Sequence, residues 1–275
     1  MDQISRRQSL GRMFMLLGGG GLASCGCHSV PMTGRKQLLV YPEGHEVTLG
    51  QQAYSQVTEK TPLSDNETYR SVVQQVGSRI AAVAGRADFA WEFKTLKSAE
   101  QNAFCLPGGK VAVHEGIIPI CENEAGLAVV MSHEIAHALA RHGGERMSQN
   151  AAVQGVQTAA SYVLKTQEQV KRDMVLKAYG VATEYGVLLP YSRKHESEAD
   201  RIGVMLMAQA GYDPAEAPKF WTRFGGAAKT EKPAEFLSTH PSDERRSRDL
   251  QALLPQAQTL YTQAPQQLGV GVSLS

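Results

Sequence analysis

The chain is organised around residues 129–142, Val129-Val130-Met131-Ser132-His133-Glu134-Ile135-Ala136-His137-Ala138-Leu139-Ala140-Arg141-His142. This stretch contains H-E-x-x-H and has no Gly or Pro, so it favours a helix. Because a helix advances about 100° per residue, His133 and His137 share one face and can offer two imidazole nitrogens to one Zn²⁺. Glu134 can hold a water molecule beside that ion and act as its base. Ala, Ile, Leu and Val fill most other positions, as expected for a helix whose remaining faces are buried.

Length and composition set few further limits. The chain has 275 residues, enough to bury a sizeable core as one domain with appendages. The formal net charge of +1 gives no signal for nucleic acid or for a strongly acidic partner. No internal repeat is evident.

The N-terminal segment resembles a bacterial lipoprotein signal peptide. Arg6, Arg7 and Arg12 precede an apolar stretch, residues 13–22, that is too short to span a membrane. The segment ends Leu22-Ala23-Ser24-Cys25, which resembles a lipobox, so Cys25 is expected to be lipidated. By resemblance to enterobacterial sorting rules, Gly26 favours an outer-membrane lipoprotein of the bacterial cell envelope that faces the periplasm. An ordinary cleaved signal peptide is the alternative, and general or twin-arginine export both remain open.

Beyond this segment, the hydrophobic patterns predict an α+β fold that is mainly helical. Residues 89–96 alternate as a strand, and residues 102–114 read as a hairpin. Gly143-Gly144 is expected to break or bend the helix that carries H-E-x-x-H. Further helices are predicted at residues 67–84, 192–210, 214–224 and 241–253.

A catalytic zinc site needs a third protein ligand and an open position for water. Glu196 and Asp200 are four residues apart and share a helix face, so Glu196 is the expected ligand. Asp200 can then accept a hydrogen bond from the free N–H of a ligand histidine. Glu198 lies about 200° from Glu196 and is expected to face solvent. His195 should lie beside the site or be exposed, and His142 should lie on the opposite side of its helix.

These motifs resemble the CAAX-prenyl-endopeptidase-like family of zinc metallopeptidases (HtpX/LoiP/BepA type), and the lipobox points to its periplasmic lipoprotein branch. The resemblance covers about residues 60–250. It rests on His133-Glu134-x-x-His137, Ser192-Arg193-x-x-Glu196-x-Glu198-Ala199-Asp200, Asn102-Ala103-Phe104-x-x-Pro107-Gly108-Gly109, Glu122-Asn123-Glu124-Ala125, and Thr239-His240-Pro241 with Arg246. It implies a mainly helical gluzincin domain with a small β-sheet, and one Zn²⁺ per chain held by His133, His137 and Glu196.

The residues outside the range of this resemblance, together with it, predict a domain organisation. Residues 1–24 would be a lipoprotein signal peptide and residues 25–60 a membrane tether. Residues 61–255 would form the zinc metallopeptidase domain, and residues 256–275 a flexible tail.

Further roles at the site follow from the same resemblance. Glu134 would be the catalytic base, and His240 would lie close to the metal, where it either stabilises an oxyanion or blocks the zinc in a resting state. A helix-capping residue at the surface is the alternative for His240. Arg246 would support His240 or the substrate carbonyl. Asn102 would bind substrate backbone, and the strand at residues 110–114 would pair with an extended substrate.

The expected activity is that of a zinc metalloendopeptidase that hydrolyses misfolded or unassembled envelope proteins. The alternative is a chaperone-like outer-membrane assembly factor whose zinc site is mostly self-inhibited. A structural zinc lipoprotein is less favoured, because structural sites are usually closed by four ligands rich in cysteine. The sequence leaves open the natural substrate, the oligomeric state and whether Cys105 and Cys121 form a disulfide.

Overall fold

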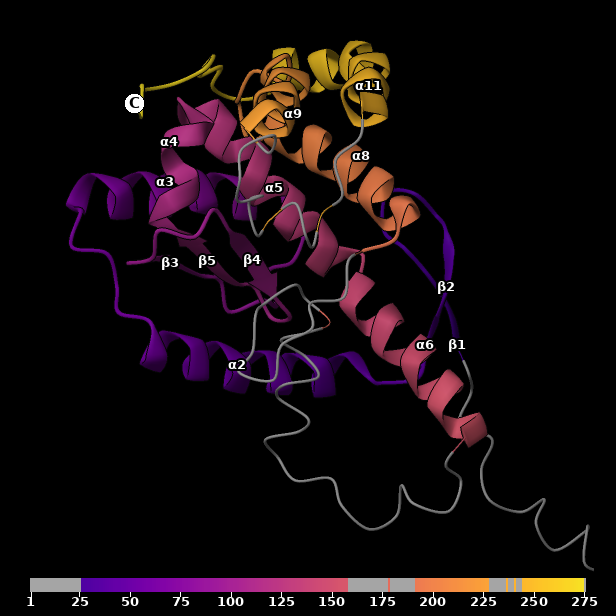
Figure 1. Cartoon of the computed structure of the whole chain (residues 1–275). Coiled ribbons are helices and arrows are strands. Elements are labelled where there is room, and N and C mark those ends of the chain that lie inside the picture. The colour runs from indigo at the N-terminus through magenta and orange to yellow at the C-terminus, as the bar shows by residue number, and fades with distance from the viewer. Residues whose placement is uncertain are drawn as a thin grey trace, which may run out of the picture.

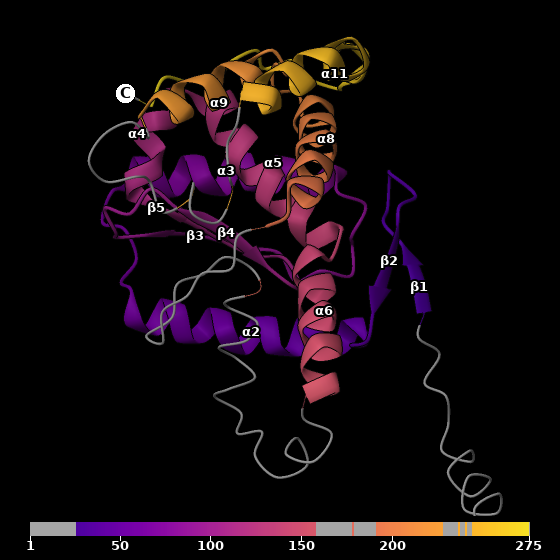
Figure 2. The ribbon, with the colours of Figure 1, turned by 45° about the vertical axis from the view of Figure 1, so that its right-hand side comes forward.

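The structure, a computed structural model, describes residues 26–157, 178, 191–227, 236, 240 and 244–274. A three-stranded sheet lies between helices on both faces (Figures 1 and 2). The strand order is β3 (Glu92–Leu96), β5 (Lys110–His114) and β4 (Ala103–Leu106), with β3 parallel and β4 antiparallel to β5. The fold is α+β and mainly helical, which confirms the predicted class.

Successive side chains of the strands point alternately into two hydrophobic cores, one on each face of the sheet. Cys105 and Val111 face the larger core with α3 (Glu67–Val83) and α5 (Glu124–Leu139). Phe104 and Ala112 face the smaller core with α2 (Glu43–Lys60), on the opposite side of the sheet. This follows from the period of two in a strand, which sends successive side chains to opposite faces.

Helix α5 is buried along its whole length. The Asn123 side chain caps its start by accepting a hydrogen bond from Gly126 N–H, and all sixteen residues are buried. A short 3₁₀ turn, Glu115–Ile117, and α4 (Ile118–Cys121) lead into it. H-E-x-x-H therefore lies in the interior, where its polar side chains need partners.

Helix α8 (Arg193–Gln209) crosses α5 closely. A Cβ on Gly203 would lie 3.1 Å from the backbone nitrogen of His133, so this glycine permits the approach. Helix α11 (Glu244–Gln263) packs on α8, and α9 (Glu216–Ala227) packs on α11 and α5 (Figure 1). The crossing brings the carboxylates of α8 next to the histidines of α5.

The chain turns sharply between α5 and α6 (His142–Gln157), but not at the glycines where we expected the break. Arg141 adopts a left-handed φ of 54°, and its guanidinium lies 2.7 Å from Glu46 Oε1 and 2.9 Å from the Tyr41 carbonyl. Gly143 and Gly144 instead belong to α6. A Cβ on Gly144 would lie 2.3 Å from Glu46 Oε1, so the glycine makes room for that carboxylate.

Both ends of the described chain are packed, whereas we expected a tether and a flexible tail there. Strands β1 (Gly26–Ser29) and β2 (Lys36–Leu39) form an antiparallel hairpin beside α6 (Figure 2), and α2 covers the sheet. Near the C-terminus, the carbonyls of Val270 and Val272 accept hydrogen bonds from the first amides of α5. The first amides of a helix have no acceptor within their own helix, so they are free to bind these carbonyls. The polar, glycine-containing segment after α11 is therefore held by backbone hydrogen bonds, which its amino-acid composition does not predict.

Three further points correct or complete the expectations. The strand at residues 110–114 is the central one, so it cannot pair with a substrate, and the prediction for it is wrong.

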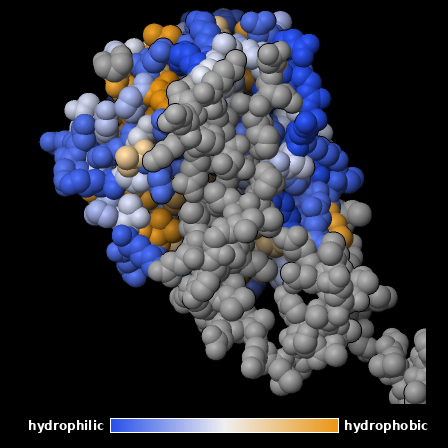
Figure 3. All heavy atoms as spheres, viewed as in Figure 1, coloured by the Kyte–Doolittle hydropathy of each residue, from blue (hydrophilic) through white to orange (hydrophobic). Residues whose placement is uncertain are grey.

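Cys105 and Cys121 are buried and unbridged. Within the described ranges, no helix combines the length and apolar character needed to cross a bilayer. On the face shown in Figure 3, the described hydrophobic residues lie in small groups among hydrophilic ones.

The crossing of α5 and α8 generates a stability prediction. Gly203→Val should lower the free energy of unfolding by about 1–3 kcal/mol, because the added carbons meet the α5 backbone, which cannot move aside. Urea denaturation measures the change. Gly226→Val in α9 is the matched control, because a Cβ there meets nothing within 4 Å, and it should change stability by less than about 0.5 kcal/mol. Equal effects of the two substitutions would contradict the packing argument.

Candidate metal centre

Four buried side chains converge at the crossing of α5 and α8. His133 Nε2 lies 3.1 Å from His137 Nε2, 3.3 Å from His240 Nδ1 and 3.4 Å from Glu196 Oε2. Glu196 Oε1 lies 3.4 Å from His137 Nε2 and 3.1 Å from His240 Nδ1. The structure thus brings together the three predicted ligands, His133, His137 and Glu196, and adds His240 as a fourth member of the group.

The spacing of these atoms fits a tetrahedral metal ion. Bonds of about 2.0–2.1 Å, usual for imidazole and carboxylate ligands of zinc, place ligand atoms about 3.3–3.4 Å apart in a tetrahedron. The five separations given above, which involve both Glu196 oxygens, span 3.1–3.4 Å, and with one ligand atom from each of the four residues all of these atoms lie within 4.8 Å of one another. Three imidazoles and one carboxylate also suit a divalent transition metal in their donor chemistry. The residues present therefore fit a metal ion.

Glu134 lies beside this group on α5. Its Oε1 is 3.4 Å from His240 Nε2, and this buried oxygen has no hydrogen-bond donor among the described residues. Burial raises the pKa of the Glu134 carboxyl above its usual value, although the nearby histidines oppose the shift. A carboxylate with a raised pKa and an unused oxygen is suited to accept a proton from a water molecule at the site.

Asp200 and Arg246 orient His133. The Asp200 carboxylate lies 3.1 Å from His133 Nδ1 and binds Arg246 through two hydrogen bonds of 2.6 and 2.8 Å. Arg246 Nη1 also lies 2.8 Å from Glu196 Oε2. Burial lowers the pKa of His133, but its bonds to Asp200 and Glu196 outweigh burial and raise the pKa to about 9. The structure thus places Asp200 beside His133 as predicted, and Arg246 contacts the Asp200 and Glu196 carboxylates, while its support of a substrate carbonyl stays a prediction.

His142 and Glu198 support His137, although neither was expected at the site. His142 Nδ1 lies 2.9 Å from His137 Nδ1, and His142 Nε2 lies 3.0 Å from Glu198 Oε2. The turn at Arg141 ends the α5 helix, so the helical angle from His133 no longer gives the position of His142. Glu198 does point to another side of α8 than Glu196, but the β1–β2 hairpin covers that side and Glu198 is buried there.

Arg35 of the hairpin neutralises the two carboxylates on this side. Its Nε lies 2.6 Å from Glu198 Oε2, and its Nη2 lies 2.6 Å from Glu145 Oε2. His195, which is buried, also contacts Glu145 at 3.1 Å. Burial alone would raise the pKa values of Glu145 and Glu198. His195 and Arg35 lower the pKa of Glu145 to about 2, and His142, Thr33 and Arg35 lower that of Glu198 to about 2.

Aromatic rings enclose the histidines. Tyr191 lies tilted against His137 with ring centroids 3.9 Å apart, and Phe236 stacks on His240 at 4.3 Å. Trp221 lies edge-on to His133 and beneath the Arg246 guanidinium, which is 3.5 Å from its ring. No motif in the sequence marks these aromatic residues as part of the site.

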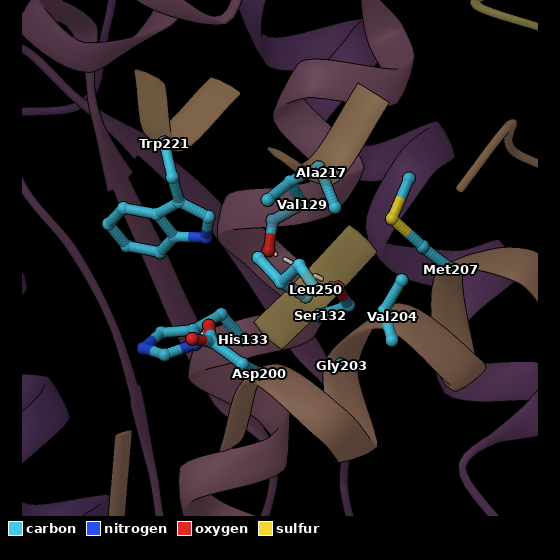
Figure 4. A pocket seen from close by; sticks show the side chains of 10 residues that line it. All are labelled: Val129, Ser132, His133, Asp200, Gly203, Val204, Met207, Ala217, Trp221 and Leu250. Atoms are coloured by element: carbon cyan, nitrogen blue, oxygen red, sulfur yellow. Dashed lines mark hydrogen bonds and ion pairs between the residues drawn. The ribbon is translucent and has the colours of Figure 1, made fainter. Parts of the chain in front are cut away.

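A small cavity lies behind His133 and Asp200 (Figure 4). Its lining comes from four helices, α5, α8, α9 and α11, and includes Val204, Met207 and Leu250. Figure 4 shows Trp221 and the pair His133–Asp200 on one side of it and mostly apolar side chains on the other. This apolar surrounding limits access of water to the rear of the group.

Two predicted residues keep the status of predictions. Asn102 is buried at the start of β4, where its Oδ1 accepts a hydrogen bond from Ala103 N–H at 2.9 Å. Its carbonyl oxygen binds His114 N–H, so substrate binding by Asn102 is not visible in this arrangement. Cys25, the predicted lipidation site, lies outside the described residues, as does the rest of the predicted signal peptide.

Comparisons with known proteins bear on the chemistry of this group. The sequence model of peptidase family M48 matches residues 68–254. The chain is 37% identical to the mitochondrial metalloendopeptidase OMA1 of Schizosaccharomyces pombe over 248 residues, 89% of this chain and 71% of that protein. The OMA1 of Saccharomyces cerevisiae is 30% identical, covering 85% and 71%. The β-barrel assembly-enhancing protease of Escherichia coli K12 is 28% identical, covering 80% of this chain and 46% of that protein.

The expected location in the bacterial outer membrane is contradicted by these comparisons. The two fungal relatives share more identity with this chain than the bacterial one, and both are mitochondrial metalloendopeptidases. The comparisons therefore overturn the outer-membrane location inferred from the lipobox-like residues, which rested on a short pattern that is easily matched by chance.

The cluster around Arg35 generates a prediction about pH. Because the pKa of Glu145 in the folded chain is about 2, its stabilising effect is complete above its unfolded pKa of about 4.3 and is lost as the pH falls toward 2. Glu145→Gln should therefore reduce the free energy of unfolding at about pH 7 and reduce it by roughly half as much at about pH 3. Urea denaturation at several pH values measures this difference.

Glu59→Gln, at an exposed position near the end of α2, serves as the control and should have little effect at either pH. If the effect of Glu145→Gln on the free energy of unfolding were the same at both pH values, the proposed pairing would be contradicted.

Proposed function

Because this chain belongs to peptidase family M48 and is a metalloendopeptidase, we propose that it uses one zinc ion to cleave unfolded or misassembled protein chains. The observation that carries the proposal is the group of His133, His137 and Glu196 with the unused Glu134 oxygen beside it. Two histidines and a glutamate, with a second glutamate as a base, are typical of zinc peptidases.

The roles of the side chains follow from their positions. A zinc ion in this group would polarise the substrate carbonyl and make an attacking water more acidic. Glu134 accepts the proton of that water at Oε1 and later delivers it to the leaving amine, as its raised pKa favours. Asp200 fixes the proton of His133 on Nδ1, so that Nε2 is free to bind the metal.

The arrangement has the features of a latent state. His240 Nδ1 stands where the fourth metal ligand would be, which leaves no place for water. His133, Glu134, His137, Glu196 and His240 are each 1–2% exposed. We therefore propose that His240 blocks the zinc at rest, and that substrate gains access when His240 moves away.

The outer edge of β4 is the proposed place for the substrate. In an antiparallel pair of strands, hydrogen-bonded residue pairs alternate with pairs that are not hydrogen-bonded. Asn102 and His114 form a hydrogen-bonded pair, so Cys105, three residues later, belongs to a pair that is not, and its backbone N–H and C=O point away from β5. A substrate strand can pair there through backbone groups alone, which favours an unfolded chain over a particular sequence. Residues Ala103–Leu106 are all buried, so this pairing also requires the site to open.

A chaperone-like assembly factor is the second candidate. It is supported by the four side chains that would close the metal site, since a closed site is typical of zinc that does not react. The name of the β-barrel assembly-enhancing protease also couples an assembly role to a protease. In this case the chain would bind unfolded proteins and cleave them rarely.

The role of Glu134 can be tested with the full-length chain loaded with zinc. Glu134→Gln should lower the rate of cleavage of denatured casein by about 10²–10⁴, because the base is lost while the predicted ligands remain. Bound zinc, measured by mass spectrometry, should be unchanged. Glu67→Gln, at an exposed position on α3, is the control and should cleave like the wild type. Normal cleavage by Glu134→Gln would refute its assignment as the base.

Substitution of His240 should have the opposite effect on the cleavage rate. His240→Ala should cleave denatured casein faster than the wild type, because water and substrate gain the fourth position while three ligands still hold the zinc. The initial rate of casein cleavage at matched zinc content measures this. A slower rate with zinc retained would instead assign His240 to oxyanion stabilisation. Inactivity of both proteins, with zinc bound to each, would favour the assembly-factor candidate.

A further inference from the structure

We infer that His142 is a positioning residue for the metal ligand His137, and that the β1–β2 hairpin sustains this role through Arg35 and Glu198. The inference rests on the proposed metal site. It concerns residues that neither the zinc-ligand pattern nor the proposed cleavage reaction assigns.

The hydrogen-bond directions follow from the metal group. His137 presents Nε2 to the group, so a neutral His137 carries its proton on Nδ1 and donates it to His142 Nδ1 at 2.9 Å. His142 must then carry its own proton on Nε2, from which it donates to Glu198 Oε2 at 3.0 Å. Each ring thus has one consistent tautomer, fixed at the far end by a carboxylate.

Local structure holds His142 in this position. Its side chain is completely buried, and its ring stacks on that of His195 with centroids 4.5 Å apart. The left-handed conformation of Arg141 sets the direction in which His142 leaves the chain. A non-glycine residue in this conformation is uncommon, and here the ion pair with Glu46 holds it in place.

The hairpin fixes the other end of the chain of hydrogen bonds. Arg35 Nε lies 2.6 Å from Glu198 Oε2, and the Thr33 hydroxyl donates to Glu198 Oε1. Both residues precede the region that the family model matches. The two ligand histidines are therefore supported in parallel ways: Asp200 and Arg246 support His133 directly, while Glu198 and Arg35 support His137 through one additional imidazole.

Two substitutions at one position separate positioning from packing. The amide oxygen of asparagine can take the place of His Nδ1 and accept from His137, whereas glutamine places its amide nitrogen near His Nε2 and keeps only the bond to Glu198. His142→Gln in the full-length chain should therefore weaken zinc binding by about 10–100-fold. His142→Asn should retain most of the affinity, and competition with a chelating dye measures both.

Three measurements complete the test. Urea denaturation of the metal-free proteins reports any loss of packing, which should be similar for the two His142 variants. Arg35→Met should weaken zinc binding less than His142→Gln does. His114→Gln replaces another buried histidine, one that contacts Glu100 and lies on β5, and should leave the affinity unchanged.

Equal zinc affinities for the wild type and both His142 variants would overturn the inference, as would equal losses in the asparagine and glutamine variants. A wild-type chain that binds no zinc would overturn the proposed function together with the inference. Since affinity is measured without substrate, a chain that binds zinc but cleaves nothing, both as wild type and as His240→Ala, would leave the positioning role intact and refute only the peptidase assignment.

Discussion

Three carboxylates of one helix, Glu196, Glu198 and Asp200, are buried, and much of the structure around α8 serves to compensate their charge. An ionised carboxylate in the interior is strongly destabilising unless a cation or several donors accompany it. Arg246 accompanies Asp200 and Glu196, and Arg35 accompanies Glu198. The histidines of α5 complete the compensation, and a divalent cation among them would contribute the largest share. The positions of the hairpin, of α11 and of the metal group therefore depend on one another.

The features that the sequence predicts best are those set within a single helix. The spacing of His133 and His137, and of Glu196 and Asp200, requires only the 3.6-residue period, and the structure places all four at one crossing. The helices at residues 67–83 and 193–209 also lie within one residue of their predicted bounds. In each case a long hydrophobic pattern and a capping residue determine the element locally.

What the sequence did not reveal depends on contacts between distant segments. The helical angle placed Glu198 in solvent, but the hairpin more than 160 residues earlier in the chain covers it. His142 reaches His137 because Glu46 stabilises an unusual backbone conformation at Arg141. Neither effect has a signature in the spacing of residues along one helix. Periodicity identifies the ligands, whereas their supports come from wherever the fold brings a suitable side chain.

The contacts of Glu46 and of residues 264–274 show that the unit that folds is larger than the region that the family model matches. That region is residues 68–254, yet Glu46 fixes the end of the metal-binding helix and the segment after α11 caps its beginning. A recombinant fragment cut at the limits of the family model would lose both supports of α5. Relatives of this chain are therefore free to diverge in these flanking segments only if other residues take over the two ends of that helix.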